Sequence, residues 1–123
     1  MERVERDEKR EERITFEAVV DAYDEMERAL GWYYYLEGKI TFPFEAVCTE
    51  KKRASPLKEN EIVEVIGMAP EEECENSMFV EIEWGEDDFL DVPLEQIYPI
   101  GVDEDTKEAV EDWHYWVARG YQF

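Results

Sequence analysis

The sequence is poor in the residues that build most catalytic and transition-metal centres. It has two cysteines, Cys48 and Cys74, a single histidine, His114, and no Cys-x-x-Cys pair. A zinc site is therefore not expected. The sequence also lacks a phosphate-binding glycine loop and the Gly-x-Ser-x-Gly motif of serine hydrolases. These absences indicate that the protein is not an enzyme.

Long apolar runs are absent as well. No segment approaches the ~20 consecutive apolar residues of a membrane-spanning helix. The first thirteen residues are almost wholly charged, so no secretory signal is expected. With only two cysteines, no disulfide is supported, and a reducing cytoplasmic location is expected.

Basic side chains are scarce. The chain has 13 lysines and arginines against 34 acidic residues, a formal charge of −21, yet 44% of its 123 residues are hydrophobic. That apolar content indicates one folded domain spanning residues 1–123. Two carboxylates about 5 Å apart repel by roughly 3 kcal/mol at an effective dielectric near 20, so we expect a divalent cation to offset the charge. The same charge disfavours binding to nucleic acid and to anionic membranes.

An aromatic segment, GWYYYLEGKITFPF, joins a predicted helix to a predicted sheet. Its aromatic residues are expected in the core, with Glu37 at the end of the helix and Gly38 stopping it. Upstream, apolar residues recur at heptad-like spacing from a candidate N-cap at Thr15, which predicts one long N-terminal helix. The stripe consists of Phe16, Val19, Tyr23, Met26, Leu30 and Tyr33. Residues 1–13 lack such a stripe and are expected to fray.

The remainder predicts short strands and a final helix. Alternating apolar residues favour strands over 42–49, 61–68, 78–84, 89–94 and 98–100, with Pro43 and Pro93 indicating edge positions. This rhythm is typical of a small SH3-like antiparallel β-barrel. A C-terminal helix, capped by Asp103 or Asp105, follows and ends at Gly120. The predicted fold class is α+β: a long N-terminal helix, the barrel and the C-terminal helix.

Acidic residues are densest after Pro70, where Glu71, Glu72, Glu73 and Glu75 fill four of five positions. Acids are favoured in the first turn of a helix by its dipole, which explains some of them. Four exceed what one turn needs, and carboxylate oxygens are the ligands that hard cations such as Ca²⁺ prefer. No EF-hand loop is present, so a calcium site must be assembled from separate segments or from an irregular loop.

Several motifs together resemble those of the small acidic calcium-binding proteins of cyanobacteria. They are GWYYYLE (31–37), FPF (42–44), SPL (55–57), VIGMAPEEECE (65–75), VPL (92–94) and EDWHYW (111–116). The resemblance covers the chain from about residue 12. It implies a cytoplasmic, non-EF-hand calcium buffer that sequesters and releases calcium during signalling. It also implies an α/β arrangement compatible with the predicted one.

The resemblance further implies a set of metal ligands: Asp21, Glu25, Glu37, Glu71, Glu72 and Glu73. In relatives the position after Glu37 is often acidic, whereas here it is Gly38. That difference implies a weaker site, or a replacement acid such as Asp87 or Asp88.

A second hypothesis fits the same charge. An acidic SH3-like module could dock a basic protein partner or mimic nucleic acid. A calcium site needs several oxygens converging on one point, whereas a docking surface needs spread charge around an apolar patch. The calcium hypothesis itself also leaves room for a regulatory protein partner.

Overall fold

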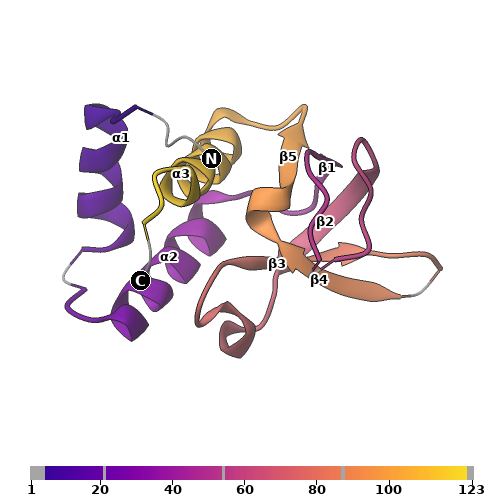
Figure 1. Ribbon diagram of the computed structural model, residues 1–123, viewed down its shortest axis with the longest axis horizontal. Coiled ribbons are helices and arrows are strands. Elements are labelled where there is room, and N and C mark those ends of the chain that lie inside the picture. The colour runs from indigo at the N-terminus through magenta and orange to yellow at the C-terminus, as the bar shows by residue number, and fades with distance from the viewer. Residues whose placement is uncertain (1–4, 21, 54, 87, 122–123) are drawn as a thin grey trace.

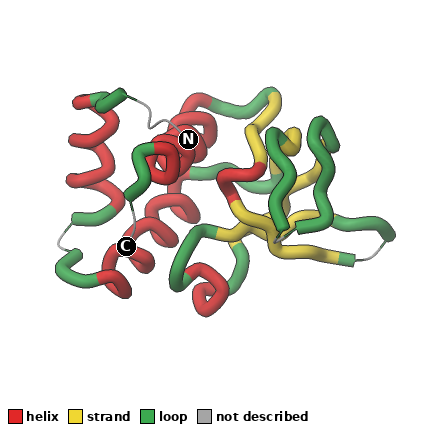
Figure 2. The backbone as a smooth tube through the Cα atoms, viewed as in Figure 1, coloured by secondary structure: helices red, strands yellow, loops and turns green. Residues whose placement is uncertain are grey.

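The computed structural model describes residues 5–20, 22–53, 55–86 and 88–121. They form an α+β fold in which the helices gather on one side and the sheet on the other (Figure 1, Figure 2). The helices are α1 (Glu8–Arg13), α2 (Glu25–Lys39) and α3 (Glu104–Ala118). The strands are β1 (Phe44–Cys48), β2 (Ile62–Met68), β3 (Phe79–Glu83), β4 (Phe89–Pro93) and β5 (Ile97–Ile100). Three short helical segments complete it: η1 (Ile14–Ala18, a π-helix), η2 (Glu71–Cys74) and η3 (Leu94–Gln96), the latter two 3₁₀-helices.

The five strands form one antiparallel sheet in the order β4-β3-β2-β1-β5. The predicted alternation is confirmed in β1, where Phe44, Ala46 and Cys48 are buried. Strand β4 lies at an edge, as Pro93 indicated, but the edge position predicted from Pro43 is wrong. Pro43 precedes β1, so it removes no hydrogen bond from a strand that pairs on both sides. Strands β4 and β5 are the two ends of the strand order and do not pair with each other, so the sheet that the described residues form is open and is not a closed barrel.

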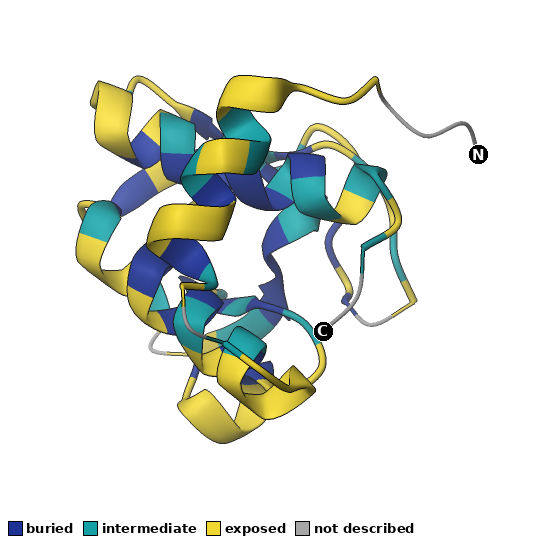
Figure 3. Ribbon diagram, turned by 90° about the vertical axis from the view of Figure 1, so that its left-hand side faces the viewer, coloured by how far each residue is buried: buried dark blue, intermediate teal, exposed yellow. Residues whose placement is uncertain are grey.

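The core lies between the helices and the inner face of the sheet (Figure 3). Trp32 of α2 is fully buried and packs edge-on against Trp113 and Trp116 of α3, with ring centroids 5.1 and 5.5 Å apart. Aromatic pairs in this geometry stabilise beyond the area that they bury. Among the aromatic residues of segment 31–44, Tyr34 is the one that is exposed, at 55%. In the described part of the chain, no helix is long and apolar enough to cross a membrane.

The prediction of one long N-terminal helix is wrong. The chain forms η1, leaves the helix after Ala18, and starts α2 at Glu25 with Asp24 as its N-cap. Asp24 accepts a hydrogen bond from the Glu27 backbone N–H at 2.8 Å. The apolar stripe thus belongs to two separate elements, and its members Phe16, Tyr23 and Met26 are 66%, 83% and 69% exposed.

Gly31 explains why the two elements can pack together. A Cβ at this position would lie well inside van der Waals contact with the backbone carbonyl oxygen of Ala18. The absent side chain allows η1 to lie directly against α2. Gly31 is therefore a packing residue and not only a weak point of the helix.

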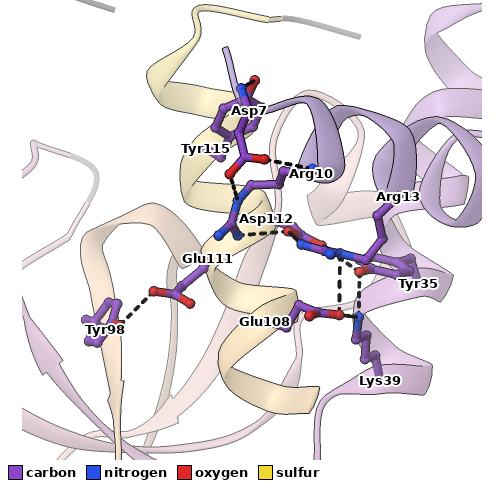
Figure 4. Close-up of polar contacts among 10 residues, drawn as sticks. All are labelled: Asp7, Arg10, Arg13, Tyr35, Lys39, Tyr98, Glu108, Glu111, Asp112 and Tyr115. Carbon is purple, nitrogen blue, oxygen red and sulfur yellow. Dashed lines mark hydrogen bonds and ion pairs between the residues drawn. The ribbon is translucent and has the colours of Figure 1, made fainter. Parts of the chain in front are cut away.

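The expectation that nothing holds residues 1–13 to the fold is wrong for α1. The buried carboxylate of Asp112 on α3 accepts hydrogen bonds from Arg10 at 2.9 Å, from Arg13 at 2.7 and 2.8 Å, and from Tyr35 at 2.7 Å (Figure 4). Glu11 adds contacts by accepting hydrogen bonds from the hydroxyls of two tyrosines, Tyr115 and Tyr121. Charge pairing, rather than an apolar stripe, attaches α1.

Candidate functional site

Helix α2 lies beside the short helix η2 (Figure 1). Two consecutive tyrosines of α2 join these elements. The Tyr33 hydroxyl donates a hydrogen bond to the Ala69 carbonyl oxygen at 2.9 Å, and the Tyr34 hydroxyl donates one to the Glu71 carboxylate. The helix–strand junction and the glutamate run, 30 or more residues apart in sequence, thus form one surface.

Glu37 belongs to the same surface. It follows Tyr33 and Tyr34 by four and three positions, the spacing of neighbours on one face of a helix. Burial, together with the negative charges of Glu37 and Glu71, raises the pKa of Tyr33 to about 12. Both carboxylates therefore lie on the side of the molecule that carries the Tyr33 hydroxyl.

The three glutamates of η2 do not all face this surface. A 3₁₀-helix has three residues per turn, so consecutive side chains point about 120° apart. Glu71 contacts α2 through Tyr34, and Glu72 lines a groove beside the same helix, whereas Glu73 does not line it. All three side chains are exposed. Of the three glutamates, Glu71 and Glu72 therefore lie on the side of η2 that faces α2.

Glu25 lies too far away to share an ion with Glu37. Both are in α2 and twelve positions apart, which corresponds to about 18 Å along a helix. Glu25 is in the first turn, where its charge favours the helix dipole. Asp21 lies outside the described residues. Of the predicted ligands, Glu37, Glu71 and Glu72 thus lie along the surface between α2 and η2, whereas Glu25 lies at the opposite end of α2 from Glu37.

The charge around this group is unbalanced. In the described residues, ion pairs involve Arg10, Arg13 and Lys39 with acids of α3, or join charged residues near each other in sequence. None of those ion pairs reaches Glu37 or the glutamates of η2. The basic side chains are concentrated around Asp112 and Glu108, as Figure 4 shows. The α2–η2 surface is left with a local negative potential that a cation would relieve.

The carboxylates of this surface are not assembled into a finished cage. Among the residues that the structure describes, no group of three or more Asp, Glu, His or Cys side chains is close enough to hold a metal ion as it stands. Calcium takes six to eight oxygens in flexible geometry, including carbonyls and water. The oxygen-only chemistry of exposed glutamates fits calcium, provided that their side chains move inward on binding.

Gly38, which directly follows Glu37, has room around it for a side chain. A Cβ built at this position meets no atom within 4 Å. Asp88, considered as a replacement acid, lies in the β3–β4 connection, at the end of the sheet far from α2 (Figure 1). Asp87 lies outside the described residues. Asp88 therefore does not replace the acid that is absent at position 38.

Sequence reasoning missed two features of this region. The sequence predicts Tyr33 and Tyr34 as core aromatics, but it does not show that their hydroxyls bind η2 to α2. Asp112 is fully buried and pairs with Arg10 and Arg13, which its position among other acids of the last helix does not predict. A sequence signal for this pairing exists, because Arg10 and Arg13 are three positions apart in a segment with no apolar stripe.

Known proteins resemble this chain over its whole length. A family model for CcbP proteins, described as calcium binding, matches residues 12–117. The crystal structure of CcbP from Anabaena is 50% identical, covers 100% of both chains and superposes with a TM-score of 0.88. A second structure, described as a calcium binding protein in the calcium-binding form, is also 50% identical, with 96% of each chain covered and a TM-score of 0.85. A comparison with curated proteins gave no match.

The family model spans most of the chain, and the solved structures share half of its residues and its fold. Their description agrees with the oxygen-rich, uncompensated surface between α2 and η2. The chain belongs to the CcbP family of calcium-binding proteins.

Proposed function

We propose that this protein is a reversible calcium buffer whose main site lies between the end of α2 and η2. The observation that carries the proposal is that Glu37 and Glu71 lie on the Tyr33–Tyr34 surface, where no ion pair within the described residues neutralises either of them. In this proposal Glu37, Glu71 and Glu72 supply carboxylate oxygens to one ion. Glu73, Glu25 and Asp21 contribute to weaker binding elsewhere.

Reversibility follows from exposure. The glutamates of this surface are solvent-exposed, so each ion replaces water rather than entering a dry cage. Two carboxylates about 5 Å apart repel by roughly 3 kcal/mol at an effective dielectric near 20, and the bound cation removes that repulsion. Sites without a preformed cage have dissociation constants of roughly micromolar to millimolar. Such a protein would release calcium when the free concentration falls.

The location of the protein, its domain organisation and the partners that it excludes are also part of the proposal. We expect one domain acting in the cytoplasm, supported by two buried cysteines that are not paired with each other. We also interpret the strand order, with η3 between β4 and β5, as an SH3-like arrangement. The formal charge of −21 argues against phosphate backbones and anionic lipids as partners. No catalytic role is proposed.

A calorimetric titration with calcium at physiological salt tests this function. The wild-type protein should give saturable heat. The variants Glu37→Gln and Glu71→Gln/Glu72→Gln/Glu73→Gln should bind the tightest ion several-fold more weakly.

The matched control is Glu59→Gln/Glu83→Gln/Glu86→Gln, which removes the same number of charges at exposed positions outside this surface. It should retain the affinity of the tightest site. Equal losses in both triple variants would mean that net charge alone attracts calcium, and absence of saturation in the wild type would contradict calcium binding.

A further inference from the structure

A groove runs along α2 on the side that faces η2. It encloses about 380 Å³, within the range of pockets that bind ligands. Its α2 wall is made by Met26, Ala29, Leu30 and Tyr33, and its other wall by Glu71, Glu72, Cys74 and Glu75. The α2 wall is mainly apolar, and the η2 wall carries three exposed carboxylates, which form the rim of the groove.

The apolar wall has the spacing of a helix-packing surface. Its four α2 residues are at positions i, i+3, i+4 and i+7, the stripe that a helix normally buries against another element. Here Met26 stays 69% exposed and Leu30 38% exposed. Of the ten large apolar side chains exposed in the described residues, six lie between positions 16 and 34. This part of the chain therefore exposes far more apolar surface than the rest.

The charges identify the chemistry of a partner. Lys or Arg side chains would find Glu71, Glu72 and Glu75 along the rim, while apolar side chains would enter the groove between Met26 and Leu30. A second copy of this chain is a poor occupant, because each copy carries −21. An anionic membrane is disfavoured for the same reason. The groove is complementary to a basic amphipathic helix.

We propose that the α2–η2 groove docks a basic amphipathic helix of a partner protein, with its apolar face on Met26 and Leu30 and its cationic residues on Glu71, Glu72 and Glu75. This docking is distinct from calcium binding, although two rim glutamates also belong to the proposed calcium site. Bound calcium would reduce the attraction of the rim for cations. The docking test is therefore made in excess chelator.

The probe is a synthetic leucine–lysine peptide of about 14 residues, a length that is marginal as an isolated helix in water and so gains helicity on docking. Its leucines are spaced to form one face. Binding is followed by fluorescence anisotropy at physiological salt, which limits general charge attraction. A serine–lysine peptide of equal charge is the comparison ligand.

The variant Met26→Ser/Leu30→Ser should weaken binding of the leucine–lysine peptide at least tenfold. The control Ile62→Ser/Phe89→Ser, which truncates two exposed apolar side chains on the sheet, should leave it unchanged. The serine–lysine peptide should bind at least tenfold more weakly to the wild type. Calcium titration of the groove variant should match wild type, because neither changed residue supplies a ligand oxygen.

Three results would overturn the proposal. Equal binding of the two peptides would mean that charge alone is recognised. Unchanged binding by Met26→Ser/Leu30→Ser would place the peptide elsewhere. A wild-type dimer in sedimentation equilibrium that this variant dissociates would assign the groove to a second copy of the chain.

Discussion

Changing Gly38 to aspartate should strengthen the calcium site. Gly38 directly follows Glu37 in the last turn of α2, is exposed, and has helical backbone geometry. A Cβ at this position meets no atom within 4 Å, so the fold accepts a side chain there without rearrangement. The new carboxylate would directly follow Glu37 in the sequence, in the last turn of α2.

The expected gain can be worked from charge. A carboxylate about 5 Å from a doubly charged ion contributes roughly 1.7 kcal/mol in water, which lowers the dissociation constant more than tenfold. The effect on the calcium-free fold is small. Aspartate is a better helix former than glycine by a few tenths of a kcal/mol, but an acid near a helix C-terminus costs about 0.3–1 kcal/mol.

Calorimetry at matched ionic strength measures the change. Gly38→Asn is the control, because it has nearly the same shape and no charge. We expect Gly38→Asp to bind calcium about tenfold more tightly and Gly38→Asn to resemble the wild type. An unchanged affinity for Gly38→Asp, or an equal gain for Gly38→Asn, would show that position 38 is not part of the ion's environment.

Three further predictions concern the fold. Gly31→Ala should destabilise the protein by about 1–3 kcal/mol in urea denaturation, because the new Cβ overlaps a backbone carbonyl oxygen. The control Gly38→Ala should stabilise it by up to about 1 kcal/mol. A stabilised Gly31→Ala protein would contradict the close packing of η1 on α2. Asp112→Asn should lower the free energy of unfolding by about 3 kcal/mol, because it leaves two arginines beside an uncharged buried group. The control Asp105→Asn, at an exposed position, should change it little. Equal effects of the two substitutions would refute the role of the ion pairs. The folded state raises the pKa of Tyr33 from its ordinary 10.0 to about 12. The stabilisation that comes from this protonated hydroxyl should therefore be complete below pH 10 and be lost towards pH 12. Tyr33→Phe should reduce this loss in denaturation curves, and an unchanged loss would mean that other groups cause it.

Much of the sheet was predictable because its residues alternate cleanly. Phe44, Ala46 and Cys48 face inward as their spacing predicted, and β4 is an edge strand. A strand with one buried face has little freedom in register, so the pattern determines which residues enter the core. Helix α3 was predictable from local signals, since Asp103, one of its two candidate caps, is the N-cap.

The N-terminal region was not predictable from periodicity alone. The heptad-like stripe runs across two elements, and the break between them depends on contact between Gly31 and Ala18, thirteen positions apart. The attachment of α1 depends on Asp112, about 100 positions away in sequence. Interactions of this range leave no local pattern. Asp24 with Glu27 had the spacing of a helix start and was the one local signal of the break.

The candidate site was predictable in part. Glu37 and Glu71 lie on one surface because Tyr33 and Tyr34 of α2 hold η2 against that helix. The resemblance supplied the acidic positions without their separation, so it could not show that Glu25 and Glu37 lie about 18 Å apart along one helix. Residue type indicated the chemistry, and three-dimensional contacts decided which residues act together.

The central claim is that calcium relieves the repulsion of a carboxylate surface that has no basic partner. Thermal denaturation of the wild type in calcium, in chelator and in magnesium, at equal ionic strength, tests it most directly. At a calcium concentration a hundred times the dissociation constant, stabilisation should be about 2.7 kcal/mol, which raises the melting temperature by roughly 10 °C over chelator. A melting temperature that is the same in calcium and in chelator would contradict the claim.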